Sequence, residues 1–329
     1  MKRCAEDGAT TEELSEEERK LYDRQIRLWG LDAQKRLNKF RVCIAGLTGL
    51  GAEVAKNVIL AGVARVALLD EKNLSSGDQR TQFMVSPDDV GKNRAESSLR
   101  YARRLNPMVN VDASEGNILD KGDDFLKEFD MVVVCDMIPV QKIFDFNDRC
   151  RKLGVKLIVG HVLGGIGFFM SDLLNFSYVQ ETVLHMKDGK KSKHEELSEQ
   201  FPPLREILNA QYVDKKNGGA LNKRSCRLAF LFHLLLAFYD TEVSNAAPSK
   251  QDLTKFVPEV AARLGAGEDR FKVDSLDELL SLEPCPVAAV LGGVLGQEVI
   301  KVASQNCKPF CNVFLFDGDS CVGTTELFK

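Results

Sequence analysis

Two arginines stand three positions apart in the segment YDRQIRLWG (residues 22–30), just before the first predicted strand. Arg24 and Arg27 lie close to Trp29, the single tryptophan of the 329 residues. A guanidinium neutralises phosphate oxygens and binds them in a fixed geometry. Either arginine could therefore serve phosphate chemistry, and the phosphate need not be bound by this same chain.

A glycine-rich turn is the second candidate for phosphate chemistry. Gly46, Gly49 and Gly51 follow a short apolar run and open a predicted helix. Glycine lets the backbone approach a phosphate, and a helix N-terminus offers unpaired N–H groups. Asp70 ends the next apolar run, where a carboxylate could accept hydrogen bonds from ribose hydroxyls. The turn predicts a nucleotide site, with a tight turn that binds nothing as the alternative.

The elements that position these residues alternate between apolar runs and amphipathic segments. Strands are predicted at residues 40–46, 64–70, 131–135 and 155–160, and helices at 14–37, 52–60, 91–105 and 140–153. This alternation is typical of βαβ units, so we expect an α/β fold with a Rossmann-like, doubly wound, mainly parallel sheet. Further along, helices are predicted at 225–239, 253–264 and 287–304, and a strand hairpin at 312–317 and 322–327. The polar stretch 182–225 reads as an irregular insertion.

Composition excludes several classes of function. The net charge is -4, which argues against nucleic acid as a partner. No run approaches the roughly 18 apolar residues of a membrane span, so no membrane contact is expected. Nine cysteines without a CxxC pair indicate reduced thiols in the cytosol or nucleus. Four histidines without paired spacing argue against a metal site.

Five segments together resemble the activating enzymes of ubiquitin-like modifiers. They are residues 22–30, 46–63, 90–96, 105–109 and 286–301. The resemblance is to the smaller, non-catalytic subunits of the heterodimeric SUMO-activating enzymes, with a ThiF/MoeB-like pseudo-adenylation domain. It implies that a larger catalytic subunit binds ATP and Mg²⁺, adenylates the SUMO C-terminus and carries the thioester cysteine. It also implies SUMO and the SUMO-conjugating enzyme as partners through the complex, and a nuclear as well as cytoplasmic location.

The same resemblance divides the chain into four parts. Residues 1–18 are expected to be a flexible tail, and residues 19–175 the nucleotide-binding-like α/β part. Residues 176–284 correspond to a degenerate catalytic-cysteine-type half domain with helices. Residues 285–329 return to the adenylation-type domain.

Several positions depart from the pattern of active family members. Thr81 stands where an active member has arginine, and Arg94 stands where it has lysine. Met137 and Ile138 replace the patterned loop after Asp136. The resemblance therefore implies that Gly46, Gly49, Gly51 and Asp70 form a vestigial nucleotide site. The alternative is that Arg80 or Arg94 substitutes for the missing groups.

No catalytic cysteine is expected in this chain, because a thioester-forming thiol must be exposed and activated. Cys226 lies at the start of an apolar helix, and Cys285 stands between two prolines. By resemblance, Arg24 crosses to the partner subunit and contacts the ATP bound there. Arg27 is expected on a solvated helix face or in a salt bridge across the subunit interface. Alternatives are a self-sufficient MoeB- or ThiF-like adenylating enzyme, the regulatory subunit of the neddylation-pathway enzyme, and an NAD-dependent oxidoreductase, which the glycine spacing disfavours.

Overall fold

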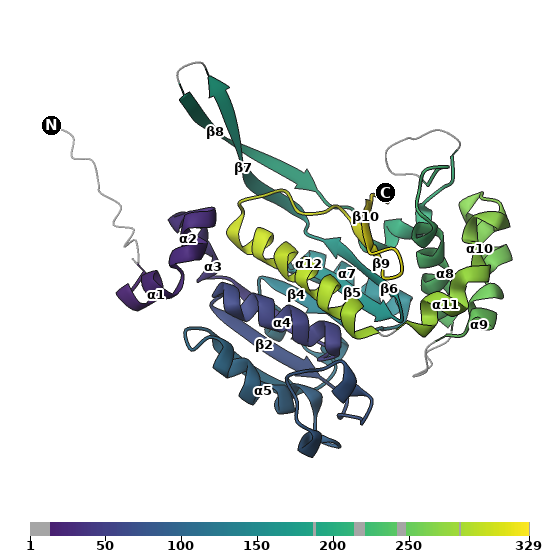
Figure 1. The fold of residues 1–329 in the computed structure, drawn as a ribbon, viewed down its shortest axis with the longest axis horizontal. Coiled ribbons are helices and arrows are strands. Elements are labelled where there is room, and N and C mark those ends of the chain that lie inside the picture. The colour runs from purple at the N-terminus through teal and green to yellow at the C-terminus, as the bar shows by residue number, and fades with distance from the viewer. Residues whose placement is uncertain (1–13, 187–188, 214–220, 242–247, 283, 329) are drawn as a thin grey trace.

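A single large sheet organises the protein (Figure 1). The computed structural model describes residues 14–186, 189–213, 221–241, 248–282 and 284–328. Within these ranges eight strands pair in the order β10-β9-β6-β5-β4-β1-β2-β3. Their bounds are β1 (Arg41–Ala45), β2 (Arg65–Asp70), β3 (Asn110–Glu115), β4 (Met131–Val134), β5 (Lys156–Leu163), β6 (Ile166–Asp172), β9 (Val313–Asp317) and β10 (Val322–Glu326). The five strands from β3 to β5 are parallel, and β6, β9 and β10 are antiparallel additions, so the mainly parallel α/β prediction is confirmed.

Helices cover both faces of the sheet, as a parallel sheet with apolar strands requires. One apolar core lies between the sheet and α4 (Gly49–Ala61), α5 (Arg94–Leu105) and α12 (Pro284–Ser304). The other core lies beneath α7 (Val140–Leu153) and α8 (Arg227–Thr241). The central strand β4 is buried on both faces because all four of its residues are apolar. Two strands of this sheet were not predicted from the sequence: β3, which is mostly polar, and β6, which is wholly buried.

Helices α4 and α12 pack unusually closely because α12 presents two glycines to α4. A Cβ on Gly292 would lie 2.4 Å from the Cβ of Glu53, and a Cβ on Gly296 would lie 2.7 Å from the Cβ of Asn57. By length and composition α12 could cross a membrane, yet 67% of its most apolar window is buried inside this fold. It therefore has the character of a core helix.

The predicted charged helix at residues 14–37 is three short helices in the structure. They are α1 (Glu16–Leu21), α2 (Asp23–Trp29) and α3 (Leu31–Leu37). Tyr22 separates the first two, and Gly30, with φ at +88°, separates the last two. Because α1 begins at Glu16, the expected tail of residues 1–18 is helical in its last part, while residues 1–13 lie outside the described residues.

An antiparallel pair, β7 (Asn175–Met186) and β8 (Gly189–Gln200), occupies part of the stretch predicted to be irregular. The expectation of an irregular segment from residue 182 is therefore wrong up to Gln200. Figure 1 shows the pair projecting from the body, and its base is held where Val179 N–H donates to the carbonyl of Gln305 (2.9 Å).

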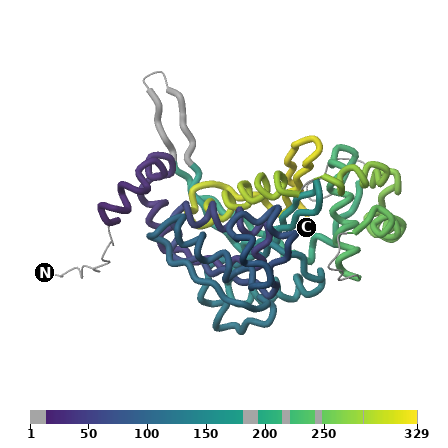
Figure 2. Tube along the Cα trace, turned by 60° about the horizontal axis from the view of Figure 1, so that its bottom comes forward, coloured from purple at the N-terminus to yellow at the C-terminus, as the bar shows by residue number. Residues whose placement is uncertain are grey.

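Helices α9 (Lys250–Thr254), α10 (Val257–Leu264) and α11 (Leu276–Ser281) gather with α8 at the end of the molecule opposite the N-terminal helices (Figure 2). The predicted helix at residues 253–264 is thus α10, preceded by the separate short helix α9. Phe168 of β6 and Phe232 of α8 pack edge to face with ring centroids 5.0 Å apart, so these helices share a core with the sheet. The four-part division of the chain stays a prediction.

Candidate functional site

The glycine turn joins β1 to α4 and packs tightly against its own chain. Gly46 has φ at +90°, a left-handed conformation that glycine adopts without strain. A Cβ on Gly51 would lie 2.0 Å from the carbonyl oxygen of Gly46. A Cβ on Gly49 would lie 2.8 Å from the Cβ of Thr81, because the loop carrying Thr81 lies against the first turn of α4. These contacts explain why glycine is needed at all three positions, and the explanation requires no bound phosphate.

Asp70, the predicted ribose acceptor, is already engaged within the chain. Its Oδ2 accepts hydrogen bonds from the backbone N–H of Leu47 (2.6 Å) and from Nε of Arg94 (2.9 Å). Its Oδ1 accepts from the backbone N–H of Lys72 (2.9 Å) and from Nη2 of Arg94 (3.1 Å). Asp70 is 4% exposed. The carboxylate thus ties the glycine turn to α5 and has no evident capacity left for a ribose.

Arg94 lies at the centre of a buried ion cluster. Arg94 forms a bidentate ion pair with Asp70. In addition, its Nη2 donates to Asp136 (3.0 Å) and its Nη1 donates to Asp78 (3.3 Å). The ammonium of Lys72 also donates to Asp136 (2.8 Å). A guanidinium satisfies several carboxylates at once because its five N–H groups point in fixed directions. Arg94 therefore acts here as an internal counter-ion.

The charges in this cluster stabilise one another. Burial alone would raise the pKa of Asp136, but the charges of Lys72 and Arg94 outweigh burial and lower it below its usual range. Burial would likewise lower the pKa of Arg94, but Asp70, Asp136 and Asp78 raise it instead. Asp136 and Arg94 are therefore both charged at neutral pH.

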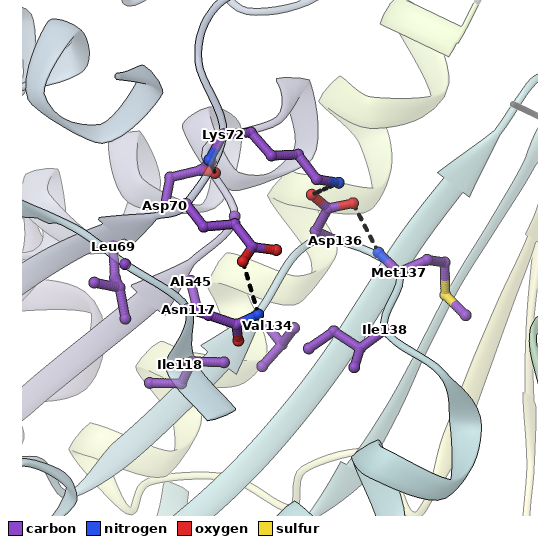
Figure 3. Close-up of a pocket in the computed structure, with 13 residues that line it drawn as sticks. Ala45, Leu69, Asp70, Lys72, Asn117, Ile118, Val134, Asp136, Met137 and Ile138 are labelled. Carbon is purple, nitrogen blue, oxygen red and sulfur yellow. Dashed lines mark hydrogen bonds and ion pairs between the residues drawn. The ribbon is translucent and has the colours of Figure 1, made fainter. Parts of the chain in front are cut away.

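A small cavity remains beside the cluster, at the carboxyl ends of β1, β2 and β4 (Figure 3). Lys72 and Asp136 line it on one side, and Ile118 and Met137 line it with apolar surface. Its volume is about 40 Å³. Pockets that bind small molecules usually have volumes of roughly 300–1,000 Å³. A cavity of this size does not hold a nucleotide.

The two positions predicted to be degenerate do not offer a free cation: Thr81 is uncharged, and Arg94 is paired within the chain. The hydroxyl of Thr81 donates to the carbonyl of Asp78 (3.4 Å), and no cation stands at this position beside the turn. Arg80 is exposed, and Arg94 is held by the three carboxylates. Arg94 is therefore not free to bind a phosphate at the N-terminus of α4. Substitution by Arg80, which adjoins Thr81, stays an alternative.

Arg24 lies far from this chain's own glycine turn. It belongs to α2, which is attached near the opposite end of α4: Nε2 of Gln25 donates to the carbonyl of Leu60 (3.1 Å). The 13 residues of α4 separate that end from the turn, a length of roughly 20 Å. The side chain of Arg24 is exposed and, among the described residues, has no hydrogen bond or ion pair. Arg24 is therefore available to another molecule and not to its own turn.

The neighbours of Arg24 have local partners. Arg27 forms an ion pair with Asp23 of the same helix (3.0 Å). Nε1 of Trp29 donates to Oε1 of Gln34 (3.1 Å), and the carbonyl of Trp29 accepts from Asn306 (3.0 Å). Arg27 thus lies on an exposed helix face with an ion pair inside its own helix, and a salt bridge across an interface stays a prediction. Trp29 fastens the end of α2.

The described cysteines are free thiols, and several are shielded. Burial raises the pKa of Cys226, which makes a reactive thiolate scarce at neutral pH. Cys285 is exposed at the start of α12. In the described ranges no three His, Cys, Asp or Glu side chains are arranged to hold a metal ion.

Tyr22, Gly62 and Asn106 form a joint that was not predicted from the sequence. The hydroxyl of Tyr22 accepts a hydrogen bond from Nδ2 of Asn106 (2.9 Å). These residues come from three of the five resembling segments, and that shared membership is the signal that could have found them.

Comparison with known proteins shows the family of this chain. The model of the ThiF family matches residues 22–320. SUMO-activating enzyme subunit 1 of Xenopus tropicalis is 39% identical over 339 aligned residues, covering 95% of this chain and 96% of the relative. The human protein of the same name is 36% identical, with the same coverage of both chains.

A solved structure supports the fold alone. A crystal structure of Escherichia coli MccB with succinimide superposes with a TM-score of 0.55 at 16% sequence identity, covering 94% of this chain and 71% of that one. With the family model and the relatives, it fixes the Rossmann-like architecture. The chain belongs to the ThiF family and, within it, to the family of SUMO-activating enzyme subunit 1.

Proposed function

We propose that this chain is the smaller, regulatory subunit of a heterodimeric SUMO-activating enzyme. Its larger partner binds ATP and Mg²⁺, adenylates the C-terminus of SUMO and receives it as a thioester on its own cysteine, a ligase-type reaction. This chain alone is inactive, and it meets SUMO and the SUMO-conjugating enzyme through the complex. We also propose a nuclear and cytoplasmic location. A lysine-rich run at residues 187–193, a candidate for nuclear targeting, begins outside the described residues.

The observation that carries the proposal is the contrast between two arginines. Arg94 is enclosed by Asp70, Asp78 and Asp136 in the place where an active member would engage the nucleotide. Arg24 is exposed at the other end of α4. A chain with a filled site and a free arginine fits the supporting half of an adenylating pair.

Exposed apolar side chains around Arg24 support a protein partner at this face. Leu28 of α2 is 78% exposed, Leu21 is 51% exposed and Leu60 at the end of α4 is 43% exposed. Apolar side chains exposed together in this way often mark an interface. If the larger subunit covers these three leucines, Arg24 comes to lie against that subunit.

Arg24 is proposed to act on the phosphates of the ATP held by the partner. Adenylation builds negative charge around the α-phosphorus, and a guanidinium placed there stabilises that charge. Arginines supplied from another chain are worth about 10³–10⁵ in phosphoryl transfer. Because adenylation is a different reaction, we expect a smaller effect of at least about tenfold.

The test is ATP–pyrophosphate exchange with SUMO, measured for this chain, for the catalytic subunit and for the mixture. Exchange that occurs only in the mixture supports the proposal. Exchange by this chain without its partner would instead support the self-sufficient adenylating enzyme. Arg24→Ala should assemble normally but lower the exchange rate. Arg27→Ala, which removes an arginine with a local partner, is the matched control. Equal rates for Arg24→Ala and the unmodified complex would refute the role in trans.

A further inference from the structure

The helix that carries Arg24 is held to the body at a few defined points. None of the seven residues of α2 is buried. Its middle is tied by Gln25 to Leu60, and its end by Trp29 to Gln34 and Asn306. Its beginning is fixed by Tyr22, which is 2% exposed. The position of Arg24 therefore depends on residues outside its own helix.

Tyr22 is the junction between α1 and α2. Its backbone N–H donates to the carbonyl of Glu18 (2.9 Å), which closes α1. Its carbonyl accepts from the N–H of Ile26 (2.8 Å), which is the first hydrogen bond of α2. Arg24 follows two positions later, so a displacement of Tyr22 moves the helix turn that carries Arg24.

The ring of Tyr22 sits in a close-fitting socket made by two distant segments. A Cβ on Gly62, which ends α4 with φ at +85°, would lie 2.4 Å from Cζ of Tyr22. Nδ2 of Asn106 donates to the tyrosine hydroxyl (2.9 Å) and to the carbonyl of Ile59 (3.0 Å). Oδ1 of Asn106 accepts from the N–H of Met108 (3.1 Å). The amide of Asn106 is thus held by two backbone groups in addition to the tyrosine.

We infer that Tyr22, seated between Gly62 and Asn106, is a positioning residue that sets the reach of Arg24 towards the partner's nucleotide. The inference rests on the proposed function of Arg24. Alignment of a charged group with a reacting centre is sensitive to displacement, since an error of about 1 Å can cost as much as about 10²-fold in rate. The hydroxyl of Tyr22 contributes by fixing the ring against Asn106, while Gly62 leaves the space that the ring fills.

The first experiment measures how firmly α2 is held to the body and does not depend on an activity assay. Hydrogen–deuterium exchange of the full chain, followed by mass spectrometry, compares Tyr22→Phe with the unmodified protein. Loss of one hydrogen bond at the joint should speed exchange of the amides of α2 by about fivefold. Tyr212→Phe is the matched control, because the hydroxyl of Tyr212 also accepts one side-chain hydrogen bond, from Arg270 (3.0 Å), away from α2. Unchanged exchange in α2 for Tyr22→Phe would overturn the inference, whatever Arg24 does.

The second experiment measures coupling between Tyr22 and Arg24 in the assembled complex. Adenylation rates at saturating ATP and SUMO are compared for Tyr22→Phe, Arg24→Ala and the double variant. We expect Tyr22→Phe to lower kcat by about three- to tenfold and to have no further effect when Arg24 is already alanine. An equal loss in both backgrounds, or no loss in either, would overturn the inference. If Arg24→Ala alone leaves the rate unchanged, the proposed function in trans fails, whereas exchange in α2 still reports on the joint.

Discussion

Replacing Arg94 by methionine tests whether the ion cluster is an internal substitute for a ligand. Methionine is similar in length and flexible, so it fills the space while removing the charge. Asp136 would keep Lys72 as its partner, and Asp78 would keep the hydroxyl and N–H of Ser75. Asp70, with a side chain 2% exposed, would keep its two backbone donors but lose its counter-ion.

The magnitude follows from that single uncompensated charge. Breaking a buried pair by removing one partner costs about 3–5 kcal/mol in unfolding free energy. An unfolding entropy of about 2.1 cal/mol/K per residue, over 329 residues, amounts to roughly 0.7 kcal/mol/K. The melting temperature of Arg94→Met should therefore fall by roughly 4–7 °C.

Differential scanning calorimetry with two companion variants isolates the cause. Arg205→Met removes an arginine that also pairs with two carboxylates, Asp145 and Asp148, but is 42% exposed against 7% for Arg94. It should cost about 1 kcal/mol or less. Adding Asp70→Asn to Arg94→Met removes the stranded charge and should restore part of the loss. Equal losses for Arg94→Met and Arg205→Met, or no recovery from Asp70→Asn, would refute the role of Arg94 as a counter-ion.

Two further predictions concern stability. Gly62→Ala should lower the unfolding free energy by more than about 2 kcal/mol, because a left-handed alanine costs about 1–2 kcal/mol and its Cβ would also overlap the ring of Tyr22. Burial lowers the pKa of His233 to about 3. The folded protein holds this ring in its neutral form. The ring therefore contributes its full share of the unfolding free energy above the unfolded-state pKa near 6.5, and this share is lost as the pH falls towards 3. Urea unfolding should show a loss of about 2 kcal/mol between pH 7 and pH 5.

Each of these predictions has a matched control. Gly154→Ala places alanine at φ +72° with no atom within 4 Å of the new Cβ, so it should cost less than Gly62→Ala, and equal costs would contradict the overlap. His233→Leu removes the buried ring, whose two nitrogens have no hydrogen-bond partner among the described residues. The pH-dependent loss should shrink in His233→Leu, and an unchanged pH profile would assign it to other groups.

Much of the sheet was predictable because its central strands are short apolar runs. Met131–Val134 is apolar throughout and buried on both faces, and the helix Val140–Leu153 has the bounds that its pattern predicts. The edge strand Asn110–Glu115 was missed because it is mostly polar and half exposed. The projecting pair was missed because its second strand, Gly189–Gln200, is polar and carries no turn signal that separates it from a loop.

The sequence predicted which residues belong to the candidate site, but not which of them contact one another. The sequence singled out Asp70, Arg94 and Asp136, yet their contact depends on where two strand ends and the start of α5 meet. Tyr22 and Asn106 stand 84 positions apart and meet through the end of α4. Local patterns specify each element, whereas such contacts follow from the topology of the whole sheet.

The close fit of α12 on α4 has a consequence for biosynthesis. Gly292 and Gly296 reach α4 from a segment that leaves the ribosome more than two hundred residues later. Strand β9, which pairs with β6, also follows it by more than one hundred residues. Because contacts between distant segments form slowly, the nascent chain holds an apolar α4 face and an open β6 edge until α12 and β9 are made. Folding of the sheet is therefore expected to be completed only after these segments are made, and aggregation is the competing process until then.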